Sequence, residues 1–168
     1  KQGIKNLIID LRDNPGGGLN EVLNVAYTMI PKDKVIVSIR AKNGDEDVYK
    51  SQGDEKIDMR LVVLVNGGSA SASELLTGAL KDYGIATIVG TQTFGKGIVQ
   101  SYFHLSDNRG WAKMTTDAYY TPNGVCIHGV GITPDIVVDL PEGIKGTSVD
   151  MIDPAKDTQL QAAIRVFA

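Results

Sequence analysis

The chain has 168 residues, of which 42% are hydrophobic and 22% charged, and its formal net charge is −3. This length fits one globular domain with a hydrophobic core of its own. The mild acidity and the lack of any basic run argue against a nucleic-acid-binding protein. Apolar runs such as Leu61–Val65 have the length of a strand and are too short to cross a membrane, so we expect no membrane contact from this part of the protein.

Hydrophobic periodicity divides the chain into short strands and three helices, separated by turns rich in glycine and proline. The order of elements predicts a mixed α/β fold in which glycine-rich turns join strands to helices. In chain order, the predicted strands are Ile4–Leu11, Lys34–Ala41, Asp45–Ser51, Leu61–Val65, Ala86–Val89, Ile98–Leu105, Trp111–Tyr120 and Ile136–Leu140, and the predicted helices are Leu19–Ile30, Ser71–Tyr83 and Ala155–Phe167.

Turn and cap residues mark the ends of several elements. Gly84 suits the C-terminal cap of the second helix, while Asp153 and Pro154 predict the start of the third. Asn43-Gly44 and the segment Ser106–Gly110 have the composition of hairpin turns.

The segment Asn66–Glu74 is a run of small residues between a buried strand and a helix. Such residues let the backbone turn sharply and let a substrate come close. A serine at a helix N-terminus lies near free backbone N–H groups and the positive end of the helix dipole, where an oxyanion is stabilised. The alternative is that Ser71 caps the helix and Glu74 completes a capping box. Both interpretations use the same residues.

The segment Gly90–Gly97 matches the pattern G-x-x-x-x-G-K of a phosphate-binding loop. Gly97, however, occupies the position at which such a loop needs a magnesium-binding Ser or Thr. The residues that follow predict a strand, whereas the phosphate would need a helix N-terminus. Nucleotide binding is therefore disfavoured.

Lys96 in the same segment is a candidate general base. A lysine has this role only when burial lowers its pKa from about 10.4 to near 7. Phe94, Ile98 and Val99 would supply an apolar setting. If Lys96 begins a strand, Gln100 lies on the same face and could orient the amine. The alternative is a surface lysine in a turn.

The cluster Asp13–Gly18 also stands between a strand and a helix, and its three glycines offer backbone N–H groups that suit an oxyanion hole. The alternative is a turn that starts the helix. His104 and His128 are further candidate bases without an acidic neighbour in sequence, and Asp10 with Asp13 as a glycosidase pair has no supporting feature.

Cysteine and histidine are too few for a ligand cluster. Cys126 is alone, which excludes a disulfide within the chain and a cysteine-based metal site, and we expect it to be a half-buried residue on a strand. We therefore predict no metal site built from these residues.

Four motifs together resemble the C-terminal processing peptidases, the S41 or tail-specific protease family. They occur in the family's order between Gly3 and Leu140. The motifs are LIIDLRDNPGG (Leu7–Gly17), VNGGSASASELLTGALKDYG (Val65–Gly84), VGTQTFGKGIVQ (Val89–Gln100) and HGVGITPD (His128–Asp135).

The resemblance implies an architecture similar to the ClpP/crotonase spiral of ββα units, with a mixed sheet and flanking helices. It also implies a peptidase core over residues 1–140, which lacks a preceding strand and helix, and a C-terminal extension with a terminal helix over residues 141–168. This chain is expected to be an excised piece of a longer parent chain that carries a PDZ domain. The parent is expected to act outside the cytoplasm, that is, in the periplasm, at the cell surface or in the lumen of a membrane-bound compartment.

The resemblance further implies a serine endopeptidase that cleaves protein or peptide substrates near their C-termini. Ser71 would be the nucleophile, Lys96 its base and Gln100 an assisting residue. The backbone N–H groups of Gly17 and Ala72 would form the oxyanion hole, and Glu74 matches the family's acidic residue after the nucleophile. The implied mechanism needs no metal and no cofactor. Two alternatives remain: a crotonase-like enzyme acting on acyl thioesters, and a catalytically idle fragment that only binds peptides.

Overall fold

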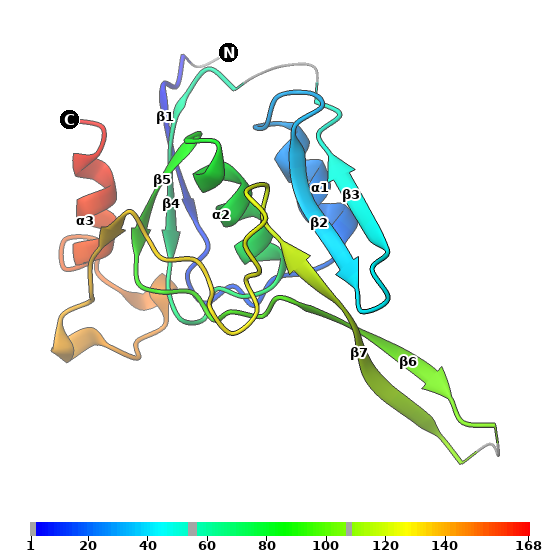
Figure 1. Cartoon of the computed structure of the whole chain (residues 1–168). Coiled ribbons are helices and arrows are strands. Elements are labelled where there is room, and N and C mark those ends of the chain that lie inside the picture. Colours follow the sequence, from blue (N-terminus) through cyan, green and yellow to red (C-terminus); the bar gives the residue numbers. More distant parts are fainter. Residues whose placement is uncertain (1–2, 54–56, 107–108) are drawn as a thin grey trace.

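The computed structural model describes residues 3–53, 57–106 and 109–168. It confirms the α/β class with flanking helices (Figure 1). The strands are β1 (Asn6–Asp10), β2 (Val35–Ala41), β3 (Glu46–Lys50), β4 (Arg60–Val65), β5 (Ala86–Gly90), β6 (Ile98–His104), β7 (Trp111–Tyr120) and β8 (Ile136–Val137), and the helices are α1 (Leu19–Tyr27), α2 (Ala72–Asp82) and α3 (Thr158–Arg165), with 3₁₀ turns η1 (Glu142–Ile144) and η2 (Val149–Met151) before α3.

The strands form two four-stranded sheets. The first has the order β1-β4-β5-β8, and all of its pairs are parallel. The second has the order β3-β2-β7-β6, and all of its pairs are antiparallel. Parallel and antiparallel pairings thus both occur, but they separate into two sheets.

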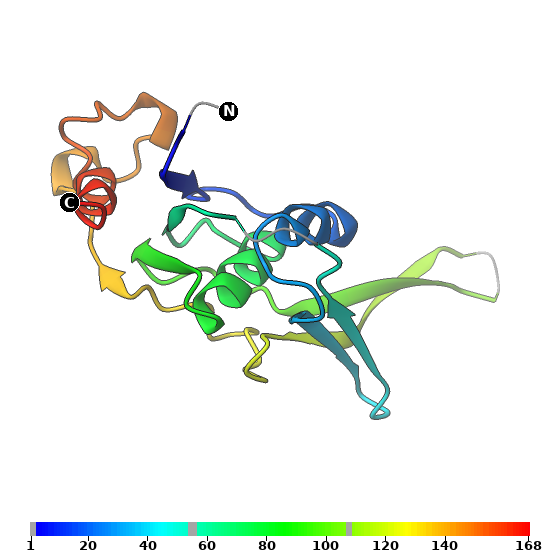
Figure 2. The same ribbon diagram turned by 90° about the horizontal axis from the view of Figure 1, so that it is seen from above.

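Helices cover both faces of the parallel sheet, and the alternation of side chains along β4 shows how. Leu61, Val63 and Val65 belong to the core shared with α1, α2 and β2, while Val62 and Leu64 belong to a smaller core under α3. The helices α1 and α2 therefore lie between the two sheets, and α3 lies on the opposite face of the parallel sheet (Figures 1 and 2). Burial on both faces explains why β4 is continuously apolar.

The third helix begins later than predicted. Its N-cap is Asp157, whose carboxylate accepts a hydrogen bond from the Leu160 N–H at 2.9 Å, and not Asp153. The prediction was wrong because Asp153 begins a separate turn, in which its carbonyl accepts from the Lys156 and Asp157 N–H groups. The predicted first helix also ends early, at Tyr27, although Met29 and Ile30 remain buried in the core.

The hairpin β6–β7 extends beyond the body of the molecule as a two-stranded arm (Figures 1 and 2). Large apolar side chains on it are exposed, among them Tyr102, Trp111 and Met114. The predicted turn Ser106–Gly110 lies partly outside the described residues. Within the described ranges, no helix has the length and hydropathy needed to cross a membrane.

The strand end at Gly90 gives a first test of the fold. Gly90 has φ 130°, and a Cβ there would lie 2.0 Å from the Val65 carbonyl oxygen of the neighbouring strand. We expect Gly90→Ala to lower the free energy of unfolding by about 3 kcal/mol, because backbone strain and overlap add. Gly84→Ala is the control: its φ is 61° but nothing lies within 4 Å, so only about 1 kcal/mol should be lost. If urea unfolding showed equal losses of unfolding free energy for the two variants, this account would be contradicted.

Candidate active site

Three motif-bearing turns meet at one edge of the parallel sheet. The strands β1, β4 and β5 are neighbours that run in the same direction, so the turns that follow them leave the sheet on the same side. These turns are residues 11–18, 66–71 and 91–97. In open parallel sheets this carboxyl edge is the usual place for a ligand site.

Ser71 stands at the junction between the turn after β4 and helix α2. Its backbone has φ 55° and ψ −118°, which a non-glycine residue rarely adopts. A serine on a strained strand-to-helix turn is the geometry of a nucleophile elbow. The capping box of Ser71 and Glu74 is also present, so the two interpretations of this segment hold together. The sequence pattern predicted the turn but gave no signal of this strain.

The other two serines of the motif have structural roles. Ser69 is fully buried and donates to the Leu11 carbonyl at 2.7 Å, while Ser73 is 4% exposed and donates to the Asn14 carbonyl at 3.1 Å. Ser71 is only half-buried. Among the three, the strained backbone and the partial exposure therefore single out Ser71 as the candidate nucleophile.

Glu74 connects the turn of Ser71 to the loop of Lys96. Its side chain is fully buried and accepts four hydrogen bonds. One oxygen accepts from the Thr93 hydroxyl at 2.6 Å and the Gly95 N–H at 2.7 Å. The other accepts from the Ser71 N–H at 2.9 Å and the Lys96 N–H at 2.8 Å. The backbones of the two predicted catalytic residues thus share one carboxylate oxygen.

The turn after β1 packs directly against the serine turn. The Asn14 carbonyl accepts from the Ala70 N–H at 3.0 Å, and the Asn66 side chain exchanges hydrogen bonds with Asp13. Gly16 has φ 94°, and a Cβ there would lie 2.8 Å from the Ala72 nitrogen and 3.0 Å from the Ser71 Cβ. Glycine at this position therefore lets the two turns touch.

The fourth motif supports the loop of Lys96 from the other side. The Thr93 hydroxyl accepts from the Ile132 N–H at 2.6 Å, and the Gly95 carbonyl accepts from the Gly129 N–H at 2.9 Å. Thr93 is 5% exposed and joins Glu74 to this segment. Sequence reasoning did not single out Thr93, although it lies within a motif.

The surroundings of Lys96 differ from the expectation. Its side chain is exposed, and Phe94, which was expected to shield it, is itself 67% exposed. Phe94 therefore does not bury the amine, whereas Ile98 and Val99 are half-buried, and the backbone of the loop faces Glu74.

The expected link between Lys96 and Gln100 is also not formed by strand alternation. The strand β6 begins at Ile98, after Lys96, and its register shifts between Val99 and Gln100. Gln100 is exposed and lies opposite Thr115 of β7. Its assisting role stays a prediction from the resemblance.

The predicted oxyanion-hole residues share one hollow. Gly17 and Ala72 both line a cavity of about 270 Å³ between α1 and α2, with apolar walls that include Val22, Val25 and Leu76. Ala72 is the first residue of α2, so its N–H has no acceptor within the helix. No side chain approaches the Cβ position of Gly17, which leaves its backbone open.

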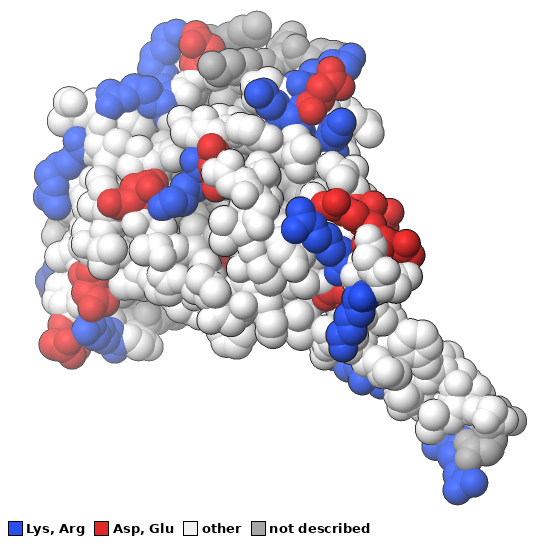
Figure 3. All heavy atoms as spheres, in the orientation of Figure 1, with Lys and Arg blue, Asp and Glu red and all other residues white. Residues whose placement is uncertain are grey.

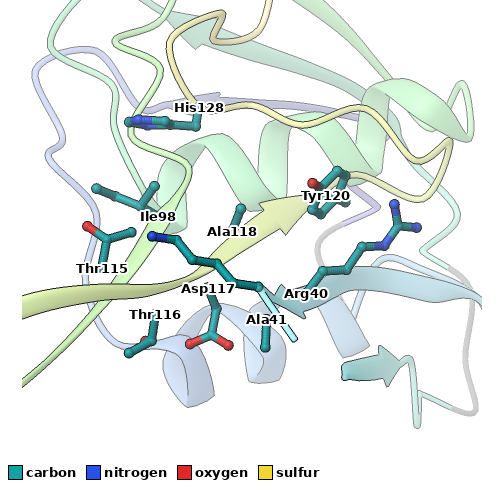
Figure 4. A pocket seen from close by; sticks show the side chains of 10 residues that line it. Arg40, Ala41, Ile98, Thr115, Thr116, Asp117, Ala118, Tyr120 and His128 are labelled. Atoms are coloured by element: carbon teal, nitrogen blue, oxygen red, sulfur yellow. The ribbon is translucent and has the colours of Figure 1, made fainter. Parts of the chain in front are cut away.

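A second hollow, of about 320 Å³, lies on the antiparallel sheet and contains His128 (Figure 4). Ile98, Thr115 and Tyr120 line it as well. The other histidine, His104, ends β6 at the distal end of the arm, where its ring contacts Trp111 edge-on at 4.9 Å. The arm directs His104 away from the turn of Ser71.

Neither the surface charge nor the possible metal ligands indicate a further site among the described residues. Acidic and basic side chains are interspersed on the face shown in Figure 3. Among the described residues, no group of three or more His, Cys, Asp or Glu side chains could hold a metal ion. Cys126 is half-buried, as expected, but it lies outside the strands and forms only an isolated antiparallel β-bridge with Tyr120.

Comparisons with known proteins identify the family of this chain. Residues 1–138 match the family described as Peptidase family S41. A carboxy-terminal-processing protease of Bartonella bacilliformis is 45% identical over 151 residues, which cover 88% of this chain and 35% of that protein. A carboxyl-terminal-processing protease of Synechocystis is 43% identical over 164 residues, which cover 98% of this chain and 37% of that protein.

A solved structure gives the same result. The photosystem II D1 C-terminal processing protease superposes with a TM-score of 0.77 at 41% identity, over 83% of this chain and 37% of that one. The two-sheet α/β fold is therefore shared with a processing protease of known structure. The chain belongs to peptidase family S41. It spans about a third of the length of the relatives that it matches, and the predicted boundary at residue 140 stays a prediction.

Glu74 gives a direct test of the site. In Glu74→Gln an amide NH₂ would face N–H donors, so we expect a loss of about 3 kcal/mol in the free energy of unfolding. Glu21→Gln is the matched control, because Glu21 also lies in the first turn of a helix but is exposed; it should change stability by less than about 0.5 kcal/mol. Similar unfolding curves for the two variants would show that the four hydrogen bonds to Glu74 do not stabilise the fold.

Proposed function

We propose that this chain is the catalytic core of a serine peptidase in which Ser71 is the nucleophile and Lys96 the general base. The single observation that carries the proposal is the pairing of a strained, half-buried Ser71 with the loop of Lys96 through the buried Glu74 carboxylate. Membership in family S41 supports it. The proposed dyad needs neither a metal nor an organic cofactor.

The proposed reaction has two halves. In the first, the neutral amine of Lys96 takes the Ser71 proton while the serine oxygen attacks the scissile carbonyl carbon. The C–N bond then breaks, and the Lys96 ammonium returns its proton to the leaving amine. In the second half, Lys96 activates a water that hydrolyses the acyl-enzyme ester and frees Ser71. Gln100 is proposed to orient the amine by accepting or donating a hydrogen bond.

The oxyanion of each tetrahedral intermediate is proposed to lie between the N–H groups of Gly17 and Ala72. Both residues line the hollow next to the turn of Ser71. The Ala72 N–H also lies at the positive end of α2. Fixed backbone donors of this kind typically contribute factors of about 10²–10³ each to the rate.

The exposure of Lys96 places a condition on this mechanism. A lysine acts as a general base only where its amine is shielded from water. We propose that the bound substrate or probe covers the loop of Lys96 and excludes water. Because only the neutral amine is the base, peptide hydrolysis should increase as the pH rises.

The same exposure of Lys96 favours one alternative, in which the isolated chain binds peptides without cleaving them.

For the parent protein we propose cleavage near the C-termini of protein substrates, because the relatives are described as carboxy-terminal-processing proteases. A PDZ domain that presents the substrate tail and a location outside the cytoplasm are proposed on the resemblance alone.

A fluorophosphonate probe, which reacts with activated serines, separates these cases. We expect labelling of the chain that is abolished in Ser71→Ala and falls at least about 100-fold in Lys96→Ala, because the serine loses its base. Lys50→Ala removes an exposed lysine on β3 and should label normally. Labelling is measured by intact-protein mass spectrometry.

Peptide hydrolysis completes the test. Hydrolysis that needs Ser71 and Lys96 supports the peptidase, whereas peptide binding without labelling or hydrolysis supports the idle fragment. Labelling that survives Lys96→Ala would overturn the Ser–Lys assignment and direct attention to His128.

A further inference from the structure

A buried ionic cluster joins the C-terminal segment to the turn that carries Gly17. The Arg12 side chain is 2% exposed and forms a two-pronged pair with Asp10, with Nε–Oδ1 at 3.0 Å and Nη2–Oδ2 at 2.7 Å. Its remaining nitrogen, Nη1, lies 2.8 and 3.0 Å from the carboxylate oxygens of Asp157, which is 3% exposed. The same nitrogen donates to Gln159 at 3.1 Å.

This cluster fixes Arg12 firmly. Burial lowers the pKa of the Arg12 guanidinium, but hydrogen bonds and charges from Asp10 and Asp157 outweigh burial and raise it overall. The planar guanidinium directs one edge at Asp10 and the other at Asp157, a geometry that an ammonium cannot copy. Gln159 is in turn fixed by donating to the Val138 carbonyl at 2.8 Å.

Arg12 is also the second residue of the turn 11–18, called here the glycine turn. Asp13 with φ 55° and Gly16 with φ 94° follow it, and Gly17 comes next. On its far side the turn is supported by Asn66, which accepts from the Asp13 N–H at 2.9 Å. The turn is therefore held between the serine turn on one side and the C-terminal segment on the other.

We propose that Asp157 is a positioning residue for the oxyanion hole and acts through Arg12. The same carboxylate caps α3 by accepting from the Leu160 N–H, so it fixes the helix and the turn together. The Gly17 N–H then depends on a residue more than a hundred positions away in the chain. The catalytic part of this inference rests on the proposed function; the placement of the turn does not.

The test variant is Asp157→Asn, which keeps an N-cap but removes the charge that faces Arg12. Arg12→Lys tests the other partner of the pair. Arg60→Lys is the matched control, because Arg60 holds the opposite end of α3 by donating to the carbonyls of Val166 and Phe167.

The first readout is amide hydrogen exchange by NMR, which needs no activity. We expect the Asp13 and Gly16 amides to exchange about tenfold faster in Asp157→Asn, because one charge-assisted bond that holds the turn is weakened. Arg60→Lys should leave these two amides unchanged. Unchanged exchange in Asp157→Asn overturns the inference, whether or not the chain is a peptidase.

The second readout is reaction with the fluorophosphonate probe. If the wild-type chain reacts, the variants Asp157→Asn and Arg12→Lys should each react about tenfold more slowly. The double variant should react no more slowly than the slower of the two single variants, because both substitutions break the same ion pair. Arg60→Lys should react at the wild-type rate. A wild-type chain that does not react contradicts the proposed function alone; a reactive wild type with an equally reactive Asp157→Asn contradicts this inference.

Discussion

The carboxylate of Glu74 is the interaction on which the rest of the site depends. It is fully buried, and its two oxygens accept four hydrogen bonds from donors on two separate segments of chain, the turn of Ser71 and the loop of Lys96. An ionised carboxylate has about four acceptor positions and no donor, so this environment uses its capacity fully. An apolar side chain would leave three backbone N–H groups and one hydroxyl proton without an acceptor. The carboxylate therefore fixes the relative placement of the turn of Ser71 and the loop of Lys96.

The parallel sheet makes this convergence possible. Because β1, β4 and β5 are adjacent and parallel, three turns leave the sheet on one side, although the first and last are separated by about half of the chain. Glycine is required where the turns touch, since Gly16 lies against the backbone of Ala70 and Ala72. Strain is concentrated at Ser71, and the surrounding hydrogen bonds hold it there.

The C-terminal segment is part of the same arrangement. The helix α3 packs on Val62, Leu64 and Val89 of the parallel sheet, and so closes the face opposite α2. Its cap residue, Asp157, meets Arg12 at the start of the glycine turn. The C-terminal segment therefore contributes both to the core of the parallel sheet and to the ion pair with Arg12. It is structurally linked to the site, although it lies beyond the residues that match the family.

The sequence by itself determined the order of strands and helices and the glycine turns, because each depends on local composition. The roles of Ser71, Lys96, Gly17 and Ala72 follow from an ordered set of motifs and stay a proposal. Helix ends were less predictable: Asp153 and Asp157 are both good caps, and the buried Arg12 is the partner that distinguishes Asp157. Only the tertiary structure decided the strain at Ser71, the four partners of Glu74 and the exposure of Lys96. These properties depend on which distant backbone groups meet, and residue spacing along the chain does not contain that information.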